Sequence, residues 1–156
     1  MNKRLLKFVK EKFNIPASAL DLGMGKGEDV EGLKTIGWKV EGVDKEKGVD
    51  LNNPYVAIEP VDLVYSNFVI QFIENKEVFL KTCFNNLKEG GWLFIQTFDE
   101  SDEIMKKKFK EEELRNLLSS YFKDIKIEKF KYFDDQDGHN HWHVILEATG
   151  RKKIIK

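Results

Sequence analysis

Three histidines alternate near the end of the chain, at His139, His141 and His143 in the run GHNHWH. Alternate residues of a strand project to one face, so these imidazoles would form a row. Imidazole titrates near neutral pH and can accept a proton from a reacting group, which makes His141 and His143 candidate catalytic residues. A metal site would need further ligands from elsewhere in the chain, so we assign no metal. Packing of the strand beside Trp142 is the structural alternative.

A second group of candidates lies in the run SALDLGMGKGEDV, residues 18–30. A short apolar segment there predicts a strand, and a helix is expected from Glu28. Gly23, Gly25 and Gly27 lie between them and allow a sharp turn that a ligand can approach closely. The run therefore predicts a strand, a glycine turn and a helix, as in nucleotide-binding sites.

The charges around this turn indicate which ligand it suits. Asp21 ends the predicted strand, and Glu28 and Asp29 occupy the start of the helix, where they would repel phosphate. The dinucleotide pattern GxGxxG requires glycine at the position of Glu28. A dinucleotide-dependent reductase is therefore disfavoured, and a cationic ligand is favoured.

A further acid follows the next predicted strand. The run WKVEGVD, residues 38–44, ends in Asp44, which is placed to accept hydrogen bonds from both hydroxyls of a ribose. With LDLGMGKG, this pattern resembles the class I S-adenosylmethionine-dependent methyltransferases, whose first motif is LDLGxGxG and whose second strand ends in an acid. The alternative is a structural glycine turn in an unrelated α/β domain.

This resemblance implies the roles of particular residues. The glycine turn would lie against the methionine part of S-adenosylmethionine, Asp44 would bind ribose, and Asp50 with Leu51 would contact adenine, although Asp50 and Asn52 could be turn residues only. The implied cofactor-binding residues are Asp21, Gly23, Met24, Gly25, Gly27, Asp44, Lys45, Asp50, Leu51, Ser66 and Asn67. Ligands of open α/β sheets bind at the carboxyl ends of strands, so Phe68 and Gln71 are candidates for the acceptor pocket, with core packing as the alternative.

The order of predicted elements gives a Rossmann-like α/β sandwich, with a mostly parallel sheet and an antiparallel C-terminal hairpin. We expect a leading helix before Pro16, strands at 61–66 and 92–98, helices at 28–36, 74–87 and 111–121, a turn at 88–91, a mobile loop at 99–110, and a hairpin of 124–133 with 140–149. Only about fifteen residues separate Asp44 from the strand at Val61. We interpret Gly48–Asn53 as a stub of the third strand and expect no helix before it.

Length and composition narrow the class further. The 156 residues predict one domain, 1–150, followed by a basic tail, 151–156. The net charge of −1 disfavours a nucleic-acid partner, and no apolar run is long enough to span a membrane. Cys83 is the single cysteine, in a helical apolar pattern that indicates packing, and the chain is expected in the cytoplasm. We expect a monomer or homodimer, with a partner subunit as an open alternative.

Several segments are similar to the tellurite-resistance methyltransferases in particular: ALDLGMGKG, VDLNN ahead of DLVYSNFVIQFIE, and FKEEELRNLLSSYF. The chain departs from that pattern at Met24, in the short 45–60 segment and at its end. The resemblance implies methyl transfer from S-adenosylmethionine to a small-molecule acceptor by in-line displacement. The alternative is a non-catalytic module that binds S-adenosylmethionine and acts with a partner protein.

Overall fold

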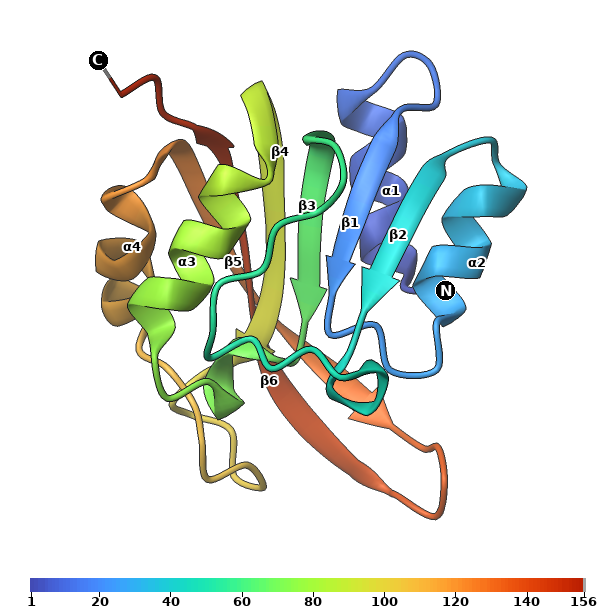
Figure 1. Cartoon of the computed structure of the whole chain (residues 1–156). Coiled ribbons are helices and arrows are strands. Elements are labelled where there is room, and N and C mark those ends of the chain that lie inside the picture. Colours follow the sequence, from blue (N-terminus) through green and yellow to red (C-terminus); the bar gives the residue numbers. More distant parts are fainter. Residues whose placement is uncertain (156) are drawn as a thin grey trace.

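The computed structural model describes residues 1–155, and these form a six-stranded sheet with the order β2-β1-β3-β4-β6-β5 (Figure 1). The strands are β1 (Ser18–Leu22), β2 (Lys39–Val43), β3 (Val61–Asn67), β4 (Leu87–Phe98), β5 (Phe122–Asp134) and β6 (His141–Lys152). The first four pair in parallel, and β6 pairs antiparallel with both β4 and β5. The predicted fold class is confirmed.

Two helices cover each face of the sheet. Helices α1 (Lys3–Lys12) and α2 (Glu28–Thr35) bury Leu5 and Leu33 against one face, where Tyr65 and Phe94 lie. Helices α3 (Lys76–Asn85) and α4 (Glu111–Ser119) pack on the opposite face. Strands covered on both faces are apolar throughout, which explains the run VDLVY in β3.

Cys83 lies in the core between α3 and the sheet. Its side chain is fully buried, and burial raises the pKa of its thiol. The thiolate, which is the reactive form, is therefore disfavoured. The prediction that Cys83 is a packing residue is confirmed.

The stub of a third strand predicted at Gly48–Asn53 is wrong. A single 3₁₀ turn, η1 (Lys45–Lys47), follows β2, and residues 48–53 then turn without pairing to the sheet. The Asp50 carboxylate accepts hydrogen bonds from the Asn52 backbone N–H at 2.9 Å and from its side chain at 3.1 Å. These local bonds offer the backbone an alternative to a strand ladder, so β2 is left at the edge of the sheet.

The rest of this connection crosses the face that carries α3 (Figure 1). Ala57 N–H donates to the Asn86 side chain at 2.8 Å, and Asn86 donates back to the Tyr55 carbonyl at 2.9 Å. The Tyr55 hydroxyl reaches Glu41 of β2. An extended segment thus covers part of this face beside α3, consistent with the expected absence of a helix after β2.

Three further segments differ from prediction. The turn expected at Lys88–Gly91 lies inside β4, where Gly90 has φ +73° and the register with β3 shifts between Val61 and Leu63. Strand β6 continues to Lys152 and so takes in the start of the predicted basic tail, whose last residue, Lys156, lies outside the described residues. The loop at 99–110 is tied back by backbone bonds between Phe109 and Phe98 and between Glu100 and Phe109.

The carboxyl ends of β1 to β4 and the tip of the β5–β6 hairpin lie at the same edge of the sheet (Figure 1). Both groups of predicted site residues lie at or next to strand ends at this edge. Among the described residues, no helix is long and apolar enough to cross a membrane.

Candidate functional site

A cluster of carboxylates surrounds the glycine turn. The Asp21 side chain, in β1, is only 3% exposed. Its pKa is raised to about 7 mainly by burial; the nearby Tyr65 hydroxyl opposes the shift, and the neighbouring charges of Asp29 and Asp44 add to it. A positive ligand would reduce this repulsion and favour the ionised carboxylate.

Asn67 Oδ1, a buried polar atom beside this cluster, has no hydrogen-bond partner among the described residues. The Tyr65 hydroxyl lies beside the Asp21 carboxylate and lowers the pKa of that carboxyl. An unpaired buried polar group costs free energy, and such a group needs an explanation such as a ligand or water. The unpaired Asn67 oxygen and the repelled carboxylates together fit a cationic ligand that also carries hydrogen-bonding groups, as S-adenosylmethionine does.

The glycine turn is fixed to the end of β2. Gly23 N–H and Met24 N–H both donate to the Val43 carbonyl, at 2.9 and 3.0 Å, and Gly25 N–H donates to the Asp44 carboxylate at 2.9 Å. Gly23 has φ +89°, and a Cβ there would lie 2.3 Å from a methyl group of Val69. Conformation and close packing therefore both require glycine at this position.

The acids after β2 differ in their surroundings. Asp44 is half-buried and also accepts from the Glu46 N–H at 3.0 Å. Asp50 is exposed, and hydrogen bonds from Asn52 lower the pKa of its carboxyl. Lys45 is exposed, whereas Leu51 is buried in the core on the α3 face. The structure thus brings Asp44 to the glycine turn and holds Asp50 in a local turn, in line with the turn alternative.

The residues at the end of β3 offer few free side-chain groups to the candidate site. The Ser66 hydroxyl donates to the Leu22 carbonyl at 2.7 Å, so it is already satisfied inside the sheet. Phe68 has φ +62°, a conformation that is strained for a bulky residue. Its ring packs on Phe98 with centroids 5.1 Å apart. Strain of this kind clusters at functional sites.

Phe68 and Gln71, predicted together as acceptor residues, have different surroundings. The Gln71 side chain, in the 3₁₀ turn η2 (Ile70–Phe72), is 5% exposed and accepts a hydrogen bond from the Thr97 hydroxyl at 2.8 Å. Phe68 instead contacts Phe98. Side chains of consecutive strand residues such as Thr97 and Phe98 project to opposite faces, so the two candidates do not share a pocket.

A cavity of about 510 Å³ opens beside the Phe68 ring. It lies between the beginning of the chain, the carboxyl end of β3 and the β5–β6 hairpin. Its lining includes Met1, Asn2, Arg4, Phe68, Gln96, Phe130, Tyr132, Phe133 and Ile145. The aromatic and apolar walls, with a few polar groups, are typical of a small-molecule site. We take this space as the candidate acceptor cavity.

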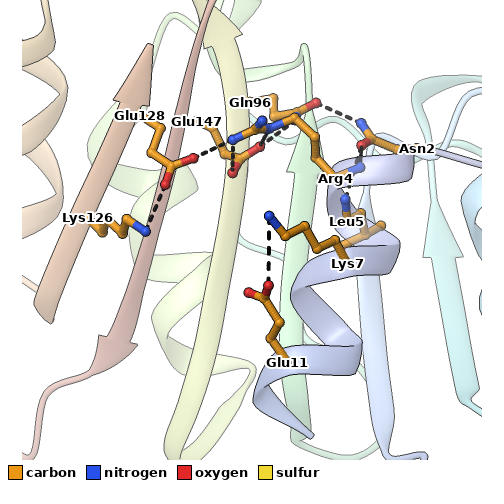
Figure 2. A network of polar contacts seen from close by, with 9 residues as sticks. All are labelled: Asn2, Arg4, Leu5, Lys7, Glu11, Gln96, Lys126, Glu128 and Glu147. Carbon is orange, nitrogen blue, oxygen red and sulfur yellow. Dashed lines mark hydrogen bonds and ion pairs between the residues drawn. The ribbon is translucent and has the colours of Figure 1, made fainter. Parts of the chain in front are cut away.

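Figure 2 shows the polar network that holds the start of α1 against the sheet. Arg4 donates to Glu147 at 2.6 Å and also bonds Glu128, and these carboxylates raise the pKa of Arg4. Gln96 joins the network by donating to Glu147 at 2.9 Å and accepting from the Asn2 amide at 2.7 Å. The network therefore fixes one wall of the acceptor cavity.

Asn2 also connects this wall to the carboxylate cluster. Its backbone N–H donates to Asp29 at 2.7 Å, and the Asn67 amide reaches the other Asp29 oxygen at 3.4 Å. The beginning of α1 thus contacts both the acceptor cavity and the glycine-turn region.

The histidines form a second cluster at the same edge. The buried His143 places Nδ1 2.9 Å from the Asp102 carboxylate and Nε2 2.9 Å from Nε2 of His141. The three rings do form a row, since His139 packs edge-on against His141 with centroids 5.3 Å apart and His141 against His143 at 4.6 Å, although β6 begins at His141 and His139 lies exposed in the hairpin turn. The His143 ring also packs on Phe98 with centroids 5.0 Å apart, and Phe98 in turn contacts Phe68.

Asp102, from the loop predicted to be mobile, is 1% exposed behind His143. Burial tends to raise its pKa, but hydrogen bonds from the backbone N–H groups of Met105, Val144 and Ile104 hold the pKa below its usual range. The ionised carboxylate accepts from the His143 Nδ1–H, so Nε2 of a neutral His143 carries the lone pair that faces His141. This carboxylate orients the histidine.

Sequence reasoning did not find Asp102, Asn2, Arg4, Gln96 or Glu147. Gln96 and Glu147 do carry a signal, since each is a polar residue within an apolar strand, WLFIQTF and HWHVILEAT. Asp102 carries none, because its loop is rich in exposed charges of both signs.

The model of a methyltransferase domain family matches residues 1–148. The chain belongs to this methyltransferase domain family. A curated relative, the mitochondrial ubiquinone biosynthesis O-methyltransferase of Rattus norvegicus, is 26% identical over a stretch that covers 53% of this chain. That stretch spans only 31% of the rat protein, well under half its length.

Solved structures of methyltransferases share the fold. A methyltransferase from Methanosarcina mazei superposes with a TM-score of 0.75 at 12% identity, over 95% of this chain and 98% of that one. The 1,6-didemethyltoxoflavin N1-methyltransferase of Burkholderia thailandensis, crystallised with its substrate and S-adenosylhomocysteine, gives a TM-score of 0.72 at 18% identity, over 97% and 78%. At such identities the likeness shows the fold.

Proposed function

We propose that this protein transfers a methyl group from S-adenosylmethionine to a small-molecule acceptor. The observation that carries the proposal is the group of three carboxylates, Asp21, Asp29 and Asp44, at a glycine turn in a chain of the methyltransferase family. The cofactor supplies a methyl group bonded to positively charged sulfur, which is already activated for displacement. The protein's tasks are then to bind, to align the acceptor and to exclude water.

The residues beside the glycine turn would hold the cofactor. Asp44 would exchange its bond to the Gly25 N–H for bonds to two ribose hydroxyls. Asn67 Oδ1 would gain the partner that it lacks, and Asp21 would be ionised opposite positive charge. The remaining predicted contacts, by Met24, Gly27, Lys45, Asp50, Leu51 and Ser66, belong to the same proposal.

The acceptor would lie in the cavity beside Phe68. Phe130 and Tyr132 give this cavity aromatic walls, and Arg4, whose charge is offset by Glu147 and Glu128, closes one side. The resemblance to tellurite-resistance methyltransferases would suit a small acceptor in this space. Gln71, whose side chain accepts a hydrogen bond from Thr97, would fix η2 against β4 beside this cavity.

His141 and His143 would accept the proton that the acceptor loses. The support is the chain of contacts Asp102, His143 and His141, in which a carboxylate orients one imidazole and that imidazole meets the next. Phe98 packs against both His143 and Phe68 and so links this pair to the acceptor side.

The test is isothermal titration with S-adenosylmethionine and, separately, S-adenosylhomocysteine. We expect micromolar binding of both by the wild type, and a loss of about 10- to 100-fold in Asp44→Ala, because a charge-assisted hydrogen bond is worth about 1.5–3 kcal/mol. Glu46→Ala removes a nearby exposed acid and is the matched control, with unchanged affinity. No binding of either compound by the wild type would refute the proposal.

Binding should be followed by a screen for turnover. Methyl-labelled S-adenosylmethionine is incubated with tellurium, selenium, thiol and carboxylate acceptors, and label is followed into the small-molecule fraction. Transfer to one class would identify the acceptor chemistry.

A partner-dependent module is the second candidate, and one observation favours it. Val56 and Ile58, in the connection between η1 and β3, are 79% and 95% exposed. Apolar side chains so exposed suit a protein contact. Cofactor binding without turnover, together with complex formation that Val56→Ser with Ile58→Ser abolishes, would support this candidate over the first.

A further inference from the structure

The tip of the β5–β6 hairpin gathers three groups that can ligate a metal. They are one imidazole nitrogen each from His141 and His143 and a carboxylate oxygen from Asp134, and all lie within 4.8 Å of one another. Asp134 ends β5 and pairs directly with His141, while His143 is two residues further along β6. From this geometry we propose that Asp134, His141 and His143 form a binding site for a divalent first-row transition metal.

The spacing of the two imidazoles supports a shared ion. Their Nε2 atoms are 2.9 Å apart. With metal–nitrogen bonds of about 2.1 Å, this separation corresponds to an angle of about 90° at a common metal, and opening it by a few tenths of an ångström gives the tetrahedral value. The Asp134 Oδ2 atom lies 4.0 Å from the His143 Nε2. A movement of under about 1 Å at the hairpin tip would bring this oxygen to the separation that two ligands of one ion require.

The residue behind the ligand His143 also suits a metal site. His143 directs Nδ1 at the buried Asp102 carboxylate, 2.9 Å away, which leaves Nε2 as the atom facing His141. A carboxylate behind a ligating histidine is the usual arrangement at metal sites, where it fixes the ring and its tautomer. Asp102 is itself held by the Val144 N–H at 2.8 Å and by two N–H groups of its own loop, at 2.9 and 2.8 Å. The ligand is therefore oriented before any ion arrives.

The ligand set indicates the class of metal. Two imidazoles with one carboxylate suit zinc or ferrous iron, whereas magnesium and calcium prefer oxygen ligands. Three protein ligands leave coordination positions open. Without an ion, the same 2.9 Å contact is an N–H···N hydrogen bond between the two histidines. The proton-accepting role proposed above belongs to this metal-free form, since a bound ion would occupy both Nε2 lone pairs. The inference concerns metal binding and stands or falls separately from cofactor binding.

The experiment is titration of the chelator-treated full chain with Co²⁺, followed by its visible absorption, and with Zn²⁺ by calorimetry, in the absence of any cofactor. We expect one metal per chain. His141→Ala removes a direct ligand and should weaken metal binding by at least about 10- to 100-fold. That loss is typical when only a residue behind a ligand is removed. Asp134→Asn should also weaken binding, and Mg²⁺ should not bind.

The hairpin offers matched controls. His139→Ala removes the exposed histidine whose ring packs on His141 but which is not a proposed ligand, and Asp135→Asn removes the exposed acid next to Asp134; both should keep wild-type affinity. Circular dichroism and thermal unfolding of each metal-free variant establish that it is folded, and Zn²⁺ should raise the unfolding temperature of the wild type but not of His141→Ala. Equal metal affinity in His141→Ala and His139→Ala would overturn the proposal, as would a wild type that binds neither Co²⁺ nor Zn²⁺.

Discussion

The glycine-turn cluster and the histidine cluster lie at the same edge of the sheet but are assembled differently. Asp21, Gly23 and Gly25 are neighbours in the chain, and Asp44 comes from the adjacent parallel strand. Asp102, Asp134 and His143 come from a loop and from both strands of a hairpin. The first cluster is built by local turns and one strand pairing, whereas the second depends on long-range packing. The residues that we propose for the cofactor are therefore brought together by local sequence, whereas those that we propose for proton transfer from the acceptor are not.

The largest effect is expected at Asp21. Because its folded-state pKa, about 7, lies above the ordinary 3.8, its contribution to stability is fully present below about pH 4 and is lost as the pH rises through 7. Three pKa units correspond to at most about 4 kcal/mol. Asp21→Asn should therefore be more stable than the wild type at pH 8 and should show less loss of stability between pH 5 and pH 8.

Urea unfolding at both pH values measures this. Glu46→Gln, at an exposed acid, is the control and should match the wild type. Equal stability of Asp21→Asn and the wild type at pH 8 would show that ionising the buried Asp21 carboxyl does not destabilise the fold.

The next effect concerns the second cluster. Asp102→Ala leaves His143 Nδ1 and the Val144 N–H without their acceptor in a buried place, and we expect about 3 kcal/mol of destabilisation. Urea unfolding measures this loss, and the exposed neighbour Glu103→Ala is the control. A loss below about 1 kcal/mol would mean that the loop is not anchored through this carboxylate.

A smaller effect is expected at Phe68, between the two clusters. Phe68→Ala removes one wall of the acceptor cavity, so KM for the acceptor should rise by about tenfold while the affinity for S-adenosylmethionine stays the same. Initial rates and calorimetry separate the two quantities. Phe72→Ala, at an exposed ring in η2, is the matched control. An unchanged KM would place the acceptor elsewhere.

The smallest effect is expected at Arg4. Its side chain is partly exposed, which weakens its ion pairs, so Arg4→Met should cost about 1 kcal/mol. Lys7→Met, which breaks an exposed pair with Glu11, should cost almost nothing. Thermal unfolding of the two variants checks the difference, and equal values would remove the network of Figure 2 from the account of how α1 is held.

The sequence predicts more of the fold than of the site. Buried runs such as VDLVY and the glycine turn carry their own periodicity and turn chemistry, so the strands and helices that contain them were predictable. Gly48–Asn53 was not, because an Asx turn at Asp50 and a short strand have similar composition. The strand through Lys88–Gly91 also resembled a turn, since two glycines are compatible with a bulge as well as with a turn.

The limits at the site have a similar origin. Asp44 could be predicted from its position after a strand. The partner of His143 could not, because Asp102 lies 41 positions earlier in a charged loop. The different surroundings of Phe68 and Gln71 follow from contacts to Phe98 and Thr97, which only the folded sheet defines.

The measurement that tests the account most directly is the affinity for S-adenosylmethionine at pH 6 and at pH 8. If a cationic cofactor lies against Asp21, binding favours the ionised carboxylate, which is the minor form of the free protein at pH 6. The account predicts binding about tenfold tighter at pH 8 than at pH 6, and the loss of this dependence in Asp21→Asn. Equal affinity at both pH values, or tighter binding at pH 6, would contradict it.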